Sequence, residues 1–169
     1  MFGNSVRVPL FIRWPGKLQA GSETSQTVQF IDFFPSLCAA AKVDVPKSYQ
    51  LPGRNIFETS NEKKPVGVFI QHDTYNTYVL RGWRTESYSY SYCFSHGFGY
   101  LYDLKNDPKE LRNLFEDEDF RTLRLKQHAA MIVKMKQIND PVLNPDSYSV
   151  LNGRTQVPFM QPAYPDRLK

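Results

Sequence analysis

The sequence predicts a mixed α and β fold, in which a four-stranded antiparallel sheet is followed by one long helix. The chain has 169 residues, enough for one domain with a hydrophobic core, and 14% of them are aromatic. This aromatic density favours a sheet-rich core over a simple bundle of helices. Four strand-like segments recur at spacings of about ten residues, which is typical of an antiparallel meander. They lie at residues 66–70, 78–84, 87–92 and 99–104.

Before the sheet, the sequence predicts one further strand and one helix. Residues 6–14 are rich in β-branched and aromatic side chains, and Pro15 ends the strand that they predict. The helix is expected after Asp32, which can cap it, because Pro35 then falls in the first turn, where a missing N–H costs little. Apolar side chains recur through Ala41 at helical steps and form one face.

The long helix after the sheet is expected to begin at Phe120, with Asp119 as its cap, and to end before Pro141. The acidic run at residues 116–119 lies where a helix N-terminus favours negative charge. A calcium loop is the weaker explanation, because neither EF-hand spacing nor a glycine accompanies the run. The expected buried stripe consists of Phe120, Leu123, Met131, Met135 and Ile138.

The composition argues against several classes of protein. No apolar run approaches the roughly 18 residues of a membrane span, and no signal peptide is visible at the N-terminus. The formal net charge is +4, but the basic residues are scattered, so nucleic-acid binding is not expected. Cys38 and Cys93 are too few for a disulfide scaffold or a four-cysteine zinc site, and they leave the redox compartment open.

The candidate ligand-binding residues are His72, Asp73 and His96. His72 and Asp73 follow a predicted strand end and His96 lies in a predicted turn, and loop ends are where binding sites tend to be built. An ordinary exposed histidine is the alternative at each position. His128 falls inside the long helix, away from other ligand types, and is expected to be structural or exposed. The sequence contains no Ser-His-Asp order, phosphate-binding loop, paired-cysteine motif or dinucleotide fingerprint.

Five blocks of the sequence share their motifs and their order with one family of enzymes. They lie at residues 1–16, 30–37, 51–56, 81–90 and 101–114. The first carries Arg-Val-Pro-Leu and Trp-Pro-Gly, and the last carries Leu-Tyr-Asp-Leu, Asp-Pro-x-Glu and Asn-Leu. Together these blocks resemble the C-terminal portion of the sulfatases, closest to the sulfamidase-like and bacterial glycan sulfatases. In the fourth block, Ser89 stands where the family has a lysine.

The resemblance implies a division of the chain. Sulfatases have a large α/β domain followed by a small subdomain, in which a four-stranded antiparallel sheet packs on one long helix. Residues 1–64 would be the C-terminal end of the large domain, and residues 65–141 the small subdomain. Residues 142–169 are expected to form a proline-rich, extended tail with no counterpart in the family. Family members are mostly secreted, periplasmic or lysosomal, so the localisation stays open.

The resemblance also implies where the chemistry lies. Sulfatases use a formylglycine, made from Cys or Ser in a Cys/Ser-x-Pro-x-Arg motif, and a divalent cation, usually calcium, held by Asp and Asn. None of the 12 prolines in this chain has Ser or Cys two positions before it. The aspartates and catalytic lysines of the family would lie upstream of Met1. We therefore expect no catalytic residue, metal ligand or cofactor in this chain, and assign calcium and formylglycine to the full-length enzymes.

Two functions remain open. In the first, the chain completes the fold of a sulfatase that acts on sulfated glycans or aryl sulfates, and His72, Asp73 or His96 contacts the sugar. In the second, it is a catalytically inactive standalone remnant that acts as a binding or structural module. Apolar side chains expected to lie exposed predict self-association or binding of a separate N-terminal half. These side chains are Phe11, Ile12, Trp14, Phe30, Phe33 and Phe34.

Overall fold

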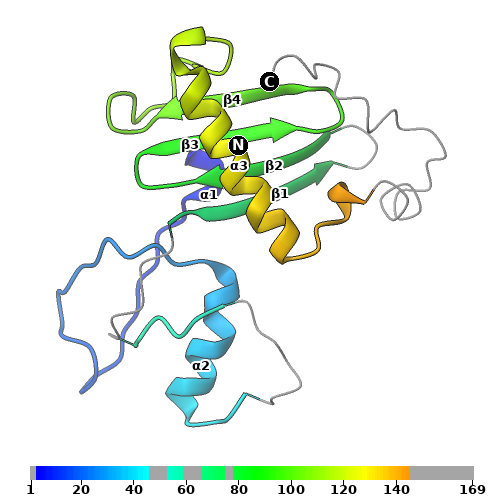
Figure 1. Cartoon of the computed structure of the whole chain (residues 1–169). Helices are drawn as coiled ribbons and strands as arrows, with labels where there is room; N and C mark the ends of the chain where they lie inside the picture. The colour runs from blue at the N-terminus through cyan, green and yellow to red at the C-terminus, as the bar shows by residue number, and fades with distance from the viewer. Residues whose placement is uncertain (1–2, 46–52, 59–65, 75–77, 145–169) are drawn as a thin grey trace. The chain divides into compact units, whose positions relative to one another are not determined.

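The computed structural model describes residues 3–45, 53–58, 66–74 and 78–144 (Figure 1). The chain forms two compact units. One is Leu10–Val66, which we call the helical unit, and the other is Met1–Pro9 together with Gly67–Lys169, which we call the sheet unit.

The sheet unit is built on four antiparallel strands: β1 Val68–Thr74, β2 Tyr78–Arg84, β3 Tyr88–Cys93 and β4 Phe98–Asp103. Their order in the sheet is β1-β2-β3-β4, so each strand pairs with its neighbour in sequence (Figure 1). This confirms the predicted meander. Because side chains alternate between faces along a strand, the Ser-Tyr repeat of β3 places its tyrosines on one face and its serines on the other.

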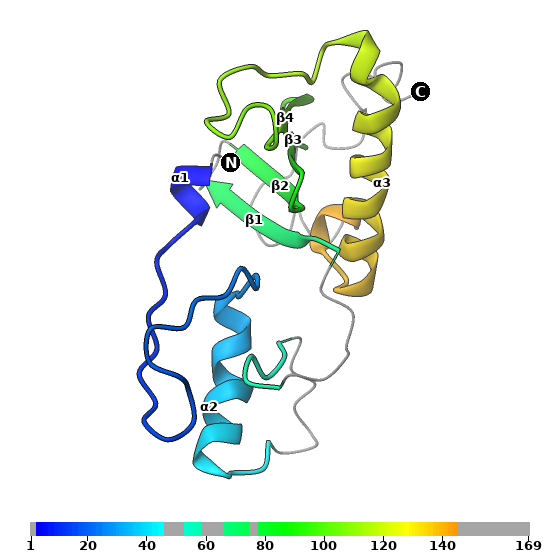
Figure 2. The same cartoon turned by 90° about the vertical axis from the view of Figure 1, so that its left-hand side faces the viewer.

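Helix α3, Arg121–Gln137, lies along the tyrosine face of the sheet (Figure 1, Figure 2). Met131 and Met135 on this helix are fully buried, as the sequence predicted. The packing of one long helix on the antiparallel sheet confirms the fold that the resemblance implied. The buried core of the sheet unit consists of Val79, Trp83, Tyr90, Tyr92, Leu101, Leu114, Phe115, Met131, Met135 and Val142.

Two more members of the predicted stripe, Phe120 and Leu123, are half-buried and pack against this core, whereas the last member, Ile138, differs from the prediction. Arg124 and Gln127 are buried, whereas Ile138 is exposed because the helix ends one residue before it. Arg124 can be buried because its guanidinium reaches back to the loop that precedes the helix. There it donates to the Phe115 carbonyl and lies 5.3 Å from the centre of the Phe115 ring.

The start of the long helix also differs from the prediction. A short 3-10 helix, Glu118–Phe120, precedes α3, and Asp117 is its cap. The Asp117 carboxylate accepts a hydrogen bond from the Asp119 amide at 3.1 Å. Asp119 therefore supplies a capped N–H instead of the capping oxygen.

The strand predicted at residues 6–14 is wrong. Gly3–Val6 forms a short helix, α1, and the residues after it have no regular structure. A strand needs a neighbouring backbone for its hydrogen bonds, and none of the described segments pairs with this one. The amide of Gly3 instead donates to the Glu110 carboxylate, which also accepts from Arg84 at 2.7 Å. These contacts hold the first residues against the sheet unit.

The helical unit contains the predicted helix, α2 at Phe33–Ala41, preceded by a 3-10 turn at Phe30–Asp32. Asp32 precedes the helix as predicted, but its carboxylate does not cap α2. It accepts from the amides of Gln29 at 2.9 Å and Arg54 at 3.0 Å. The carboxylate therefore ties a segment distant in sequence to the start of the helix.

Apolar side chains of the helical unit lie at its surface. Phe11 is 92% exposed, and Phe30 and Phe34 are exposed as well. Trp14 and Phe33 are half-buried, and Trp14 packs edge-on against a neighbouring ring. The unit therefore presents an apolar face of the kind that folded monomers rarely leave open.

Candidate functional site

Two hairpins of the sheet turn at the same end. Thr74 is opposite Tyr78 in the β1–β2 hairpin, and Cys93 is opposite Phe98 in the β3–β4 hairpin, so both turns lie at the same end of the strands. We call this end of the sheet the hairpin end. It carries all three ligand-binding residues that the sequence predicted.

His72 and His96 lie on the same face of the sheet. His72 is opposite Leu80, and Leu80 is opposite Cys93, so these three side chains project to one side. His96 is beside Cys93, whose sulfur lies 3.7 Å from His96 Nδ1. β1 and β3 are two strands apart, a separation of roughly 9–10 Å.

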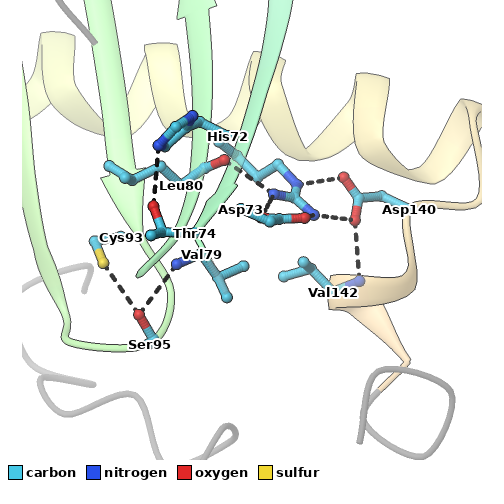
Figure 3. A network of polar contacts seen from close by, with 10 residues as sticks. His72, Asp73, Thr74, Val79, Leu80, Cys93, Ser95, Asp140 and Val142 are labelled. Atoms are coloured by element: carbon cyan, nitrogen blue, oxygen red, sulfur yellow. Dashed lines mark hydrogen bonds and ion pairs between the residues drawn. The ribbon is translucent and has the colours of Figure 1, made fainter. Parts of the chain in front are cut away.

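The face between the two histidines is continuous. His72 Nε2 lies 3.0 Å from the Thr74 hydroxyl (Figure 3). Thr74 is directly opposite Tyr78 in the β1–β2 pair. The Tyr78 ring in turn lies 4.9 Å from the His96 ring, centre to centre. Thr74 and Tyr78 therefore link the two histidines into one surface.

A serine fixes the position of His96. The Ser95 hydroxyl lies 2.8 Å from His96 Nδ1. It also lies 3.3 Å from the Cys93 sulfur and accepts from the Val79 amide at 3.2 Å (Figure 3). These contacts anchor the β3–β4 turn to the start of β2. They also engage only one of the two ring nitrogens of His96.

Asp73 points to the opposite face, where it pairs with Arg81. Its carboxylate accepts from Arg81 Nη1 at 2.5 Å, and the Asp140 carboxylate accepts from Arg81 Nε at 2.6 Å (Figure 3). Arg81 is 0% exposed, whereas the side chain of Asp73 is 44% exposed. Burial lowers the pKa of Arg81, but the hydrogen bonds to the two carboxylates raise it above its ordinary value.

His128 lies on the helix-covered face and not at the hairpin end. Its Nδ1 is 2.8 Å from the Tyr90 hydroxyl, and its ring packs edge-on against Tyr92 at 5.4 Å. Burial lowers the pKa of His128 to about 4, so its neutral form is the stable one in the fold. This is a structural histidine.

Sequence reasoning missed Tyr78 and Arg81. A signal for Arg81 was available, because an arginine inside an apolar strand must find an anionic partner when it is buried. For Tyr78 no local signal existed. Its place beside His96 follows from the pairing of two hairpins that are separated in sequence.

The described part of the chain offers no cluster of three or more His, Cys, Asp or Glu side chains that could hold a metal ion. Among the described helices, none is long and apolar enough to span a membrane.

An antiparallel sheet covered by one long helix, together with the five sequence blocks, defines the C-terminal portion of a sulfatase. The model of the family described as N-sulphoglucosamine sulphohydrolase, C-terminal, matches residues 1–137. The chain belongs to this family.

Individual relatives agree with this assignment. The uncharacterised sulfatase YidJ of Escherichia coli is 33% identical over 149 residues, which are 83% of this chain and 28% of YidJ. An N-acetylglucosamine-6-O-sulfatase of Bacteroides thetaiotaomicron is 29% identical over 154 residues, 83% of this chain and 27% of that enzyme. The chain thus spans little more than a quarter of the length of these relatives.

A solved structure shows the same fold. It is that of a protein in complex with its substrate, D-glucosamine-2-N,6-O-disulfate, with a TM-score of 0.66 and 20% identity. The match covers 80% of this chain and 28% of the solved one.

Proposed function

We propose that the chain forms the C-terminal part of a sulfatase, which completes the fold and lines the pocket for a sulfated saccharide. The formylglycine and the calcium ligands would be supplied by sequence outside these residues. The observation that carries the proposal is the family match over residues 1–137, together with the greater length of the relatives. The matched residues span 28% of YidJ.

The apolar face of the helical unit supports a role in completing a larger fold. Its exposed phenylalanines stand on a short helix and on an irregular segment, and the described residues do not cover them. We propose that residues 1–64 are the end of the large sulfatase domain and pack on the rest of it. Residues 65–141 would be the small subdomain, and residues 142–169 an extended tail.

His72 and His96 are the proposed sugar contacts. Both side chains are exposed on one face at the hairpin end, and imidazole N–H groups can donate to sulfate oxygens and sugar hydroxyls. Asp73 remains a proposed contact, but only for a ligand that reaches the opposite face, because its carboxylate also neutralises Arg81. A sulfated amino sugar is the substrate class that the Bacteroides relative suggests.

The coding sequence upstream of Met1 is the first test. The expected result is a Cys/Ser-x-Pro-x-Arg motif, either upstream in the same reading frame or in a neighbouring gene that encodes the N-terminal half. A stop codon with no partner gene would instead favour the catalytically inactive standalone module.

An activity assay is the second test. The purified chain should not hydrolyse an aryl sulfate, with or without calcium, and should self-associate or bind a separate N-terminal half in a sedimentation experiment. Metal-dependent turnover by this chain alone would contradict the proposal. A monomer at micromolar concentration would contradict the predicted packing role of the apolar face.

A further inference from the structure

One exposed aromatic side chain at the hairpin end is held in a fixed orientation. Tyr78 is 40% exposed, yet its ring contacts two others: His96 at 4.9 Å with a tilt of 34°, and Phe98 edge-on at 6.2 Å. Phe98 is in turn held edge-on by Tyr100 at 5.7 Å. An exposed ring that is already ordered loses little conformational entropy when a ligand covers it.

Polar groups flank this ring on the β1 side. Thr74 lies directly opposite Tyr78, and its hydroxyl contacts His72 Nε2. His72 and His96 each use one ring nitrogen in these contacts, and the other is free of hydrogen bonds to the described residues. An apolar ring surrounded by a few hydrogen-bonding groups is the usual composition of a small-molecule site.

The open surface is small, and its size limits what can bind there. A stable protein interface buries about 800 Å² on each partner, far more than one partly exposed ring and two imidazoles offer. Along β4 the aromatic row becomes covered, since Phe98 and Tyr100 are half-buried and Tyr102 is buried. Among the described side chains of this row, the Tyr78 end is the open one, which fits a single ring of a ligand and not a second copy of this chain.

We propose that Tyr78 stacks against the pyranose ring of a saccharide, with His96 and Phe98 as positioning residues. The face of a pyranose that carries C–H groups is apolar and loses water favourably on an aromatic ring, while its hydroxyls point outward to the free imidazole nitrogens. The choice of a saccharide rests on the proposed function. Stacking itself does not require sulfate, and this separates the two proposals.

The test uses this chain and two probes, a heparin-derived tetrasaccharide and the same tetrasaccharide after complete desulfation. Binding is followed by NMR titration. Both probes should bind, and Tyr78→Ala should weaken both by about tenfold, while Tyr78→Phe, which keeps the ring, stays within about twofold. Phe11→Ala removes a more exposed ring in the helical unit and should change neither affinity.

The variants also separate stacking from folding and from sulfate recognition. His96→Ala should weaken both probes less than Tyr78→Ala, because it frees the Tyr78 ring without removing it. Trp83 fluorescence, in a Trp14→Phe background, checks that the sheet unit remains folded in each variant. Stacking is refuted if Tyr78→Ala binds both tetrasaccharides as the original chain does, or if the desulfated tetrasaccharide does not bind. If His72→Gln loses the preference for the sulfated tetrasaccharide, the proposed contact of His72 with a sulfated sugar is supported, and the stacking proposal is unaffected.

Discussion

Removal of the Asp140 carboxylate should destabilise the sheet unit strongly, because it leaves Arg81 buried with only one of the two carboxylates that contact it among the described residues. Asp140 accepts from Arg81 Nε at 2.6 Å and from Nη2 at 3.1 Å, and both side chains are 0% exposed. Such bidentate contacts are the strongest class of ion pair in proteins. The second carboxylate, Asp73, still contacts the guanidinium but is partly in solvent.

The expected loss follows from this geometry. Removing one partner of a buried ion pair costs roughly 3–5 kcal/mol, since an uncompensated charge stays behind. Asp73 offsets part of that cost in Asp140→Ala. The Asp140 carboxylate also accepts from the Val142 amide at 3.0 Å, a cap contact whose loss adds about 1 kcal/mol. We expect a total loss of about 3–4 kcal/mol in the free energy of unfolding.

The measurement is urea unfolding followed by the fluorescence of Trp83, in a Trp14→Phe background so that only the sheet unit is observed. The control is Arg112→Ala, which breaks an ion pair with Asp117 in which the arginine side chain is 74% exposed, and which should cost less than about 1 kcal/mol. If Asp140→Ala costs no more than this control, the reasoning about Arg81 is wrong.

Three further outcomes are expected. His128 has a pKa of about 4 in the fold against an ordinary 6.5, so the stability that its neutral form contributes is complete above about pH 6.5 and is lost as the pH falls toward 4. Urea unfolding at several pH values should show a loss of at most about 3 kcal/mol from this source, absent in His128→Gln; an equal loss in both would contradict it. Gly99→Ala places a Cβ 2.1 Å from the Phe115 ring, so the melting temperature should fall with a cost of about 1–3 kcal/mol; an unchanged value would mean that the ring can move freely. Asn113→Ala removes the oxygen that accepts from the Leu101 and Phe115 amides and should cost about 2 kcal/mol in the same assay, whereas Asn113→Asp, which keeps an acceptor oxygen there, should cost less.

The sheet and the helices could be predicted from the sequence because their signals are local. Period-two alternation, short turns and helical spacing identified the four strands and helices α2 and α3. The largest difference in boundaries is at β1, which extends to Thr74 instead of ending at residue 70. The strand expected at residues 6–14 failed for the opposite reason. Its composition suits a strand, but a strand forms only beside a partner backbone, and partnership is not visible in a single segment.

The candidate site could be predicted only in part. Loop-end positions pointed to His72 and His96, and pairing of the hairpins brings both to one face. The loop-end position did not predict that Asp73, the residue after His72, points to the opposite face and pairs with Arg81. Adjacent residues on a strand always project to opposite faces, so once β1 extended through Thr74, His72 and Asp73 could not share a surface.

The motif that identified the family organises the fold in this chain and does not form the candidate site. The Asp103 carboxylate accepts from the Lys105 amide, and the Asp107 carboxylate accepts from the Arg112 amide, so both shape the turn after β4. Glu110, in the left-handed region with a φ of 56°, accepts from the amide of Gly3. These acidic residues of the motif are all engaged in holding backbone. The exposed aromatic and histidine side chains of the hairpin end lie outside this motif.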